Sequence, residues 1–164
     1  MKTKKLTTLA MISAVAMILS YVEAQLPSLG IPGVKMGLAN IAVLFALYVF
    51  RFREAAVVSM IRVAVVSLLF SGPAAFFYSL AGAVCSICVM ILLKKTKKFS
   101  PVGVSLGGGV AHNLGQIGVA MLVLETPSLL YYLPVLLLAG LGSGILVGLC
   151  GGLLLKRLPL LYRE

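Results

Sequence analysis

Seven polar or charged side chains carry most of the possible chemistry in this chain, and all of them lie within long apolar runs or close to their ends. They are Glu23, Lys35, Asn40, Arg62, His112, Asn113 and Gln116. Two are cations and one is a carboxylate, beside one histidine and three amides. Because Lys and Arg bind carboxylate and phosphate oxygens by charge-assisted hydrogen bonds, this balance favours an anionic or phosphate-bearing ligand. We therefore predict that the seven side chains converge in one binding cavity.

Two other interpretations of this polar set remain open. In the first, it is an internal network in which Glu23 neutralises Arg62 or Lys35 and the amides bind backbone groups at helix breaks. In the second, it forms a proton or ion path. His112 and Gln116 are four residues apart and share one helix face, which suits all three interpretations.

The sequence contains few residues that could form a catalytic, nucleotide-binding, redox or metal site. The chain has no Asp and only four Glu, and it lacks the GxxxxGK[ST] loop that binds nucleotide phosphates. Cys85 and Cys88 form a CxxC pair inside an apolar run, with no second pair and no nearby His. We interpret them as small buried residues of a helix rather than a redox or metal pair. We expect no metal, no cofactor and no catalytic residue.

The elements that position these residues are membrane spans. Of the 164 residues, 61% are apolar and 11% are charged, whereas soluble domains are roughly 45–50% apolar and about 25% charged. The net charge of +10 lies in short clusters between apolar runs. Such clusters are typical of topology signals rather than of nucleic-acid binding, which we exclude. The expected fold is an all-α integral membrane protein with a single membrane domain, 1–164.

Six spans are expected, with both termini in the cytoplasm and the chain in the inner, or cytoplasmic, membrane. Their approximate bounds are 6–24, 34–50, 55–70, 74–93, 101–124 and 133–155. With the N-terminus inside, 12 of the 14 basic residues lie in cytoplasmic segments. Only Lys35 is then outside, and Arg62 lies within a span. The first stretch is expected to be a retained helix, not a cleaved signal peptide, and the polar cavity should open outward.

Small residues predict how the spans pack, because helices in lipid associate where small side chains let backbones approach. The sixth span carries Gly140, Gly144, Gly148 and Gly152, and the fifth carries Gly103, Gly107, Ala111 and Gly115. We interpret both stripes as internal packing rather than an oligomer interface. The first span has Ala10 and Ala14, which predict either internal packing or a face that docks on another membrane subunit.

Five polar segments occur in an order that resembles a known family. They are Ser20-Tyr21-Val22-Glu23, Pro32-Gly33-Val34-Lys35-Met36-Gly37-Leu38-Ala39-Asn40, Arg62-Val63, His112-Asn113-Leu114-Gly115-Gln116 and Tyr131-Tyr132-Leu133-Pro134. The chain is similar, over nearly its whole length, to the family called heptaprenyl diphosphate synthase component I or Gx transporter. That family resembles the substrate-binding S components of energy-coupling-factor (ECF) transporters, which are six-helix bundles.

The resemblance implies a function and partners. It implies a substrate-binding subunit for uptake of a small vitamin-, quinone- or isoprenoid-related compound, with an ECF transmembrane coupling subunit and two ATPases as partners. Gln25 to Pro32 would be the gate, and Ala10 and Ala14 would belong to the docking face. The alternative is a non-catalytic membrane partner in prenyl diphosphate or menaquinone synthesis. Prenyl diphosphate synthases hold Mg²⁺ with clustered aspartates, which this chain lacks, so we do not expect it to be an enzyme.

Overall fold

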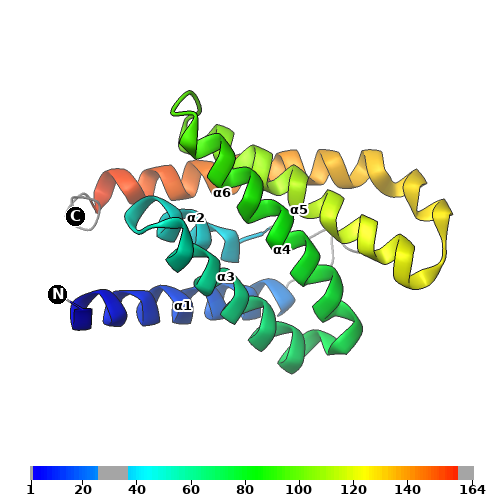
Figure 1. Cartoon of the computed structure of the whole chain (residues 1–164), viewed down its shortest axis with the longest axis horizontal. Helices are drawn as coiled ribbons and strands as arrows, with labels where there is room; N and C mark the ends of the chain where they lie inside the picture. The colour runs from blue at the N-terminus through cyan, green and yellow to red at the C-terminus, as the bar shows by residue number, and fades with distance from the viewer. Residues whose placement is uncertain (1, 26–36, 159–164) are drawn as a thin grey trace.

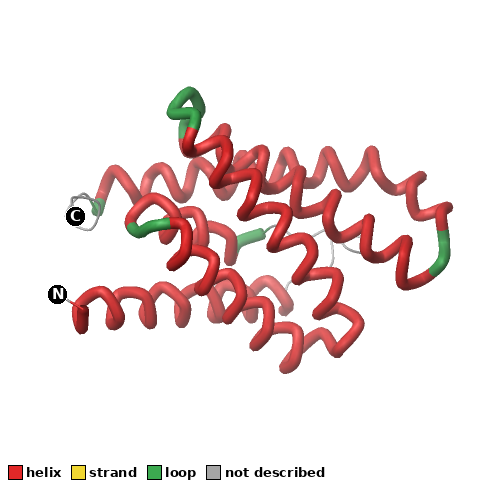
Figure 2. The backbone as a smooth tube through the Cα atoms, viewed as in Figure 1, coloured by secondary structure: helices red, strands yellow, loops and turns green. Residues whose placement is uncertain are grey.

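The computed structural model describes residues 2–25 and 37–158, and this part of the chain is helical and has no strand. It forms six α-helices. Figure 1 shows how they are arranged, and Figure 2 shows how short the described connections between them are. Their bounds are α1 Lys2–Gln25, α2 Ala39–Val49, α3 Phe52–Val66, α4 Gly72–Lys95, α5 Pro101–Leu124 and α6 Leu133–Arg157. A π-helical segment, Ser67–Ser71, joins α3 to α4, and a 3-10 turn, Pro127–Tyr132, joins α5 to α6.

Among the described residues, four segments are long and apolar enough to cross a membrane by length and composition, so the chain is a multi-pass membrane protein. They are Thr3–Glu23, Phe76–Lys95, Pro101–Leu124 and Pro127–Arg157. The other two helices are shorter: α2 has 11 residues and α3 has 15. At about 1.5 Å per residue, α2 is roughly 16 Å long, about half of the hydrocarbon core. Six crossings therefore stay a prediction.

Local sequence signals define several helix ends. The hydroxyl of Ser100 accepts a hydrogen bond from the Gly103 N–H at 3.3 Å, and Pro101 occupies the first turn of α5. This arrangement satisfies one of the free N–H groups of a helix start. Gly72 has a φ of +80°, a conformation that glycine adopts without strain, and it begins α4 directly after the π-helical segment.

The centre of the bundle is α2. Its side chains Val43, Leu44 and Leu47 are fully buried, and the helix packs against α1, α3 and α6. Its apolar residues cover all sides, as expected for a helix surrounded by other helices. The outer surface carries exposed large apolar side chains such as Met11, Leu122 and Leu138. Because the protein is embedded in a membrane, this apolar surface contacts lipid.

The glycine stripe of α6 packs internally, as predicted, except at its last member. A methyl group added at Gly140 would lie 2.9 Å from the Gly109 carbonyl oxygen of α5. At Gly144 it would lie 2.7 Å from the Leu106 Cα, and at Gly148 it would lie 2.6 Å from the Val102 Cα. At Gly152 it would meet nothing within 4 Å. The prediction is therefore wrong for Gly152, because α5 begins at Pro101 and does not cover that turn of α6.

The stripe of α5 faces another helix, α4. Added methyl groups would lie 2.3 Å from the Leu93 Cδ1 at Gly107 and 2.8 Å from the Ala81 carbonyl oxygen at Gly115. Ala111 is buried, whereas Gly103 packs on Phe99 of the preceding loop. The prediction that Cys85 and Cys88 are buried is wrong, because both lie on the exposed face of α4. The Cys85 side chain also borders α5, because its Sγ would lie 2.9 Å from a methyl group added at Gly115.

The basic clusters gather at one end of the molecule, which we call the basic end. Figure 1 shows the first and last described residues at this end, together with the α2–α3 turn. Lys5 forms an ion pair with Glu54. Lys94 donates a hydrogen bond to the Leu47 carbonyl oxygen, and its ammonium lies 4.8 Å from the Tyr48 ring centre. Both described ends thus share one side, as the charge pattern predicts; which side of the membrane this is stays a prediction.

Candidate functional site

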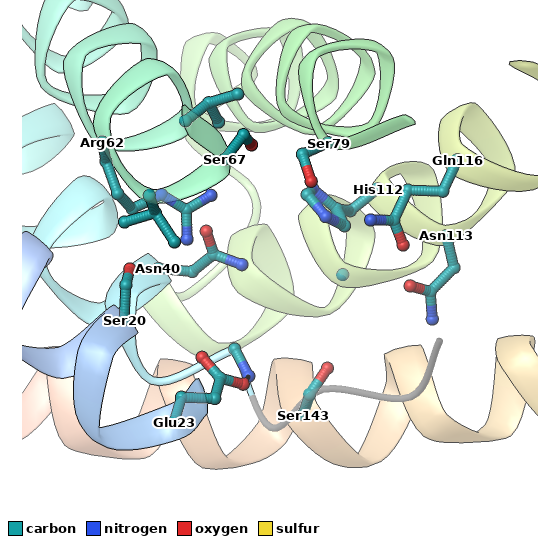
Figure 3. A pocket seen from close by; sticks show the side chains of 14 residues that line it. Ser20, Glu23, Asn40, Arg62, Ser67, Ser79, His112, Asn113, Gln116 and Ser143 are labelled. Atoms are coloured by element: carbon teal, nitrogen blue, oxygen red, sulfur yellow. Dashed lines mark hydrogen bonds between the residues drawn. The ribbon is translucent and has the colours of Figure 1, made fainter. Parts of the chain in front are cut away.

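A polar cavity lies inside the bundle, with a volume of about 90 Å³. Every long helix contributes to its wall, and Figure 3 shows the side chains that line it. The lining residues are Ser20, Glu23, Gly37, Asn40, Arg62, Val63, Val66, Ser67, Ser79, Gly109, His112, Asn113, Gln116 and Ser143. The structure therefore brings together six of the seven predicted residues. Lys35, and all of the expected gate except Gln25, lie outside the described residues.

Arg62 supplies the positive charge of the cavity. It is on α3, and Figure 3 shows its guanidinium and the amide of Asn40, from α2, pointing toward one another. Its Nε is buried and has no hydrogen-bond partner among the described residues. An unpaired Arg at membrane depth is costly, about 2.5–3.5 kcal/mol on insertion scales. A group that accepts hydrogen bonds from this guanidinium would offset that cost.

Glu23 is occupied by backbone rather than by Arg62. Its Oε1 accepts a hydrogen bond from the Gly37 N–H at 2.5 Å, which ties the end of α1 to the residues just before α2. Gly37 has a φ of +73°, a left-handed conformation that favours glycine at this contact. The charge of Glu23 is close enough to act on Arg62. Within the described chain, however, the only ion pair closer than 4.0 Å joins Lys5 and Glu54.

Three polar residues of α5 form another side of the cavity. Asn113 donates a hydrogen bond from Nδ2 to the Leu136 carbonyl oxygen of α6 at 2.5 Å. His112 and Gln116 lie against Gly82 of α4, where an added methyl group would be 2.8 Å from the Gln116 Cγ. Asn113 thus binds backbone, as the internal-network interpretation proposes. His112 and Gln116 line the cavity from the same helix face.

Sequence reasoning missed the hydroxyl groups of the cavity wall. Ser20, Ser67, Ser79 and Ser143 all line it. Ser20 lies one turn before Glu23 on the same face of α1, and this spacing was the one signal in the sequence. The others carry no such signal, because single serines are common in membrane helices and carry no charge. Ser143 donates to the Gly140 carbonyl oxygen at 3.2 Å.

The cavity's chemistry suits a small anion better than a metal. Its wall offers one guanidinium, amide and hydroxyl donors, and a carboxylate that already accepts an N–H. Over the described ranges, no three His, Cys, Asp or Glu side chains are grouped so that they could hold a metal ion. The arrangement can bind and orient an anionic group by charge-assisted hydrogen bonds.

Comparison with known proteins gives one match. The sequence profile of the family described as heptaprenyl diphosphate synthase component I matches residues 12–154. This range includes all of the cavity-lining residues. No curated protein and no solved structure matches the chain.

Proposed function

The chain belongs to the heptaprenyl diphosphate synthase component I family, and from this premise we propose that it is a substrate-binding membrane subunit of an ECF-type uptake transporter. Its ligand is a small anionic compound related to a vitamin, a quinone or an isoprenoid. The observation that carries the proposal is Arg62, whose Nε is buried at the polar cavity without a hydrogen-bond partner among the described residues. A bound anion supplies the missing acceptor.

The volume of the cavity limits which molecules can bind inside it in this conformation. Ligand pockets for drug-sized molecules are usually about 300–1,000 Å³, and this cavity is about 90 Å³. It accommodates a carboxylate or phosphate group, but not a whole vitamin or quinone. We propose that the charged group of the ligand lies beside Arg62 and that the cavity widens to take in the rest.

Partner subunits supply the energy for uptake in this proposal, because the chain has no nucleotide-binding loop. The proposed docking face is the outer side of α1, where Ala10 and Ala14 are exposed. Their neighbours Met11, Val15 and Ile18 are exposed as well. Small residues flanked by large apolar ones allow a partner helix to approach closely.

The family's description favours a second candidate, a membrane partner in prenyl diphosphate synthesis. We propose that the chain is non-catalytic in this case also, because it has no aspartate to hold Mg²⁺ on a diphosphate. Copurification with a soluble prenyl synthase, without a coupling subunit or an ATPase, would favour this candidate over the transporter.

Binding to Arg62 can be tested on the purified full-length chain in detergent. Thermal unfolding is measured with inorganic diphosphate, isopentenyl diphosphate and a small carboxylate such as nicotinate. We expect at least one of them to raise the unfolding temperature. Arg62→Ala should weaken its binding about tenfold or more, since a hydrogen bond to a charged group is worth about 1.5–3 kcal/mol. Arg62→Lys should restore binding only in part, because it lacks the planar guanidinium fork.

Arg53→Ala is the matched control, because Arg53 is exposed on the same helix and does not line the cavity. It should bind like the wild type. If Arg62→Ala bound every responding anion as tightly as the wild type, the proposed role of Arg62 would be wrong. Failure of all probes, together with a loss of stability in Arg62→Ala, would instead assign the polar set to an internal network.

A further inference from the structure

A second cavity, of about 530 Å³, opens at the basic end, between α2, α5 and α6. We call it the basic-end groove. It is lined by Tyr48, Ser100, Pro101, Val102, Gly148, Leu149, Gly152, Leu153, Leu155 and Lys156. None of these residues lines the polar cavity around Arg62. The groove therefore needs an explanation of its own, independent of the proposed function.

The floor of the groove is the last turn of the glycine stripe of α6. Gly148 is in contact with α5, but Gly152, one turn later, is uncovered by the described residues, because an added methyl group would meet none of their atoms within 4 Å. Leu149 and Leu153 flank this turn, and their side chains are 54% and 58% exposed. The floor and most of the walls are thus apolar, which suits a hydrocarbon chain.

The polar lining residues are Lys156, Ser100 and Tyr48. Lys156 is exposed and forms no hydrogen bond or ion pair with another described residue. No carboxylate lines the groove, and Glu54, also at the basic end, is already paired with Lys5. The basic-end groove thus combines the positive, hydrogen-bonding ammonium of Lys156 with an apolar floor.

We propose that the basic-end groove binds an anionic phospholipid. One acyl chain lies over Gly152 between Leu149 and Leu153, and the phosphate lies beside the Lys156 ammonium. In a bilayer, an apolar groove on the outside of a bundle is filled by lipid, because water there would lack hydrogen-bond partners. Basic pockets at the ends of transmembrane helices select anionic head groups. The volume lies within the range of about 300–1,000 Å³ that is usual for ligand sites.

The acyl-chain part of the proposal is tested with Gly152→Leu and its matched control, Gly142→Leu. Gly142 is on the same helix, is equally free of neighbours and does not line the groove. Native mass spectrometry of the full chain counts the retained palmitoyl-oleoyl phosphatidylglycerol, with the phosphatidylcholine of the same chains as the neutral probe. Gly152→Leu should lower phosphatidylglycerol retention to the phosphatidylcholine level, and Gly142→Leu should retain it like the wild type.

The head-group part is tested with Lys156→Gln, which does not fill the groove. We expect a preference for phosphatidylglycerol of about fivefold in the wild type, the effect of one basic side chain at a lipid surface, and no preference in Lys156→Gln. Arg157→Gln removes the same charge from the next residue, which does not line the groove, and should keep the preference.

Three results would overturn the proposal. They are equal retention of both lipids by the wild type, unchanged phosphatidylglycerol retention in both Gly152→Leu and Lys156→Gln, and equal losses in Lys156→Gln and Arg157→Gln. A wild-type dimer that dissociates in Gly152→Leu, with lipid retention unchanged, would also overturn it by assigning the groove to a second copy of the chain.

Discussion

Arg62 illustrates how a membrane protein keeps a charge inside an apolar bundle. The residue is surrounded by amides and hydroxyls, and Glu23 acts on it from a distance without forming a close ion pair. A close ion pair would neutralise Arg62 and occupy the hydrogen-bond donors that a ligand would need. Because Glu23 instead accepts an N–H from Gly37, the guanidinium keeps unused hydrogen-bonding capacity. We propose that an anionic ligand uses this capacity.

Gly82 leads to a prediction about the cavity wall. A methyl group there would lie 2.8 Å from the Gln116 Cγ and 2.9 Å from the His112 carbonyl oxygen, so α4 and α5 would have to separate. Gly82→Ala should therefore lower the free energy of unfolding by about 1–3 kcal/mol, the usual cost of overpacking. Thermal or denaturant unfolding in detergent measures it. Gly118→Ala on α5 is the control, because its added methyl group meets nothing within 4 Å. An equal loss in both variants would contradict this reading of Gly82.

At the scale of elements, α5 carries out three roles. Gly107 and Gly115 let it approach α4, Gly109 lets it approach α6, and His112 and Gln116 face the polar cavity. Close packing on two sides positions the polar face without long connecting loops. Asn113 reinforces the arrangement through its hydrogen bond to the Leu136 carbonyl oxygen. We infer that α5 is the rigid element against which the rest of the site is arranged.

The ion pair between Lys5 and Glu54 leads to a pH-dependence prediction. It joins the start of α1 to the first turn of α3, outside the expected spans. The hydrogen bond from Lys5 holds the pKa of Glu54 below its ordinary value of 4.5, although burial opposes it. Because the folded-state pKa is depressed, the contribution to stability is present above about pH 4.5 and is lost as the pH falls through the lower, folded-state pKa. Unfolding temperatures measured from pH 7 down to pH 3 should fall more in the wild type than in Glu54→Gln.

Glu125→Gln is the control for this measurement, because Glu125 is an exposed carboxylate in the α5–α6 turn. It should show the wild-type dependence on pH. If Glu54→Gln lost stability below pH 4.5 as steeply as the wild type, the ion pair would not contribute to holding α1 against α3.

For the whole molecule, the arrangement of the ends leads to a topology prediction. Both described ends lie at the basic end, and the α5–α6 turn lies at the opposite end (Figure 1). We predict that the basic end is cytoplasmic, because basic residues concentrate on that side. In a variant whose native cysteines are replaced by alanine, Ser128→Cys should react with a membrane-impermeant thiol reagent in intact cells, whereas Thr96→Cys should not. Labelling of Thr96→Cys from outside would contradict both the orientation and the cytoplasmic termini.

The exposed face of α1 leads to a prediction about assembly. If a coupling subunit docks there, Ala14→Leu should reduce copurification of that subunit while the isolated chain stays folded. The added bulk prevents close helix approach, and Ala14 itself is exposed in the isolated chain. Gly142→Leu, an equal change on the exposed face of α6, should leave the complex intact. An unchanged complex in Ala14→Leu would remove this face from the docking surface.

The sequence by itself determined the class of the protein and most of the site. Apolar composition requires a membrane, since no soluble fold of 164 residues buries so much apolar surface. The free-energy cost of placing a charged side chain in lipid likewise identified Arg62 and its polar neighbours as site candidates. Six of the seven predicted residues line one cavity. These inferences needed only the residue types and the properties of lipid as a solvent. The free energies of placing apolar and charged side chains in lipid are large, and they do not depend on which helix contacts which.

Only the tertiary structure decided the pairings. Which glycine contacts which helix, whether Glu23 binds Arg62 or a backbone N–H, and whether Cys85 faces inward depend on helix rotation and register. Successive glycines of one stripe look alike in sequence, yet Gly148 is packed against α5 and Gly152 faces an open groove. The physical reason is that α5 begins at Pro101, so the cover over α6 ends there. A contact between residues far apart in the chain depends on where both helices begin and end. A local sequence pattern does not predict such a contact.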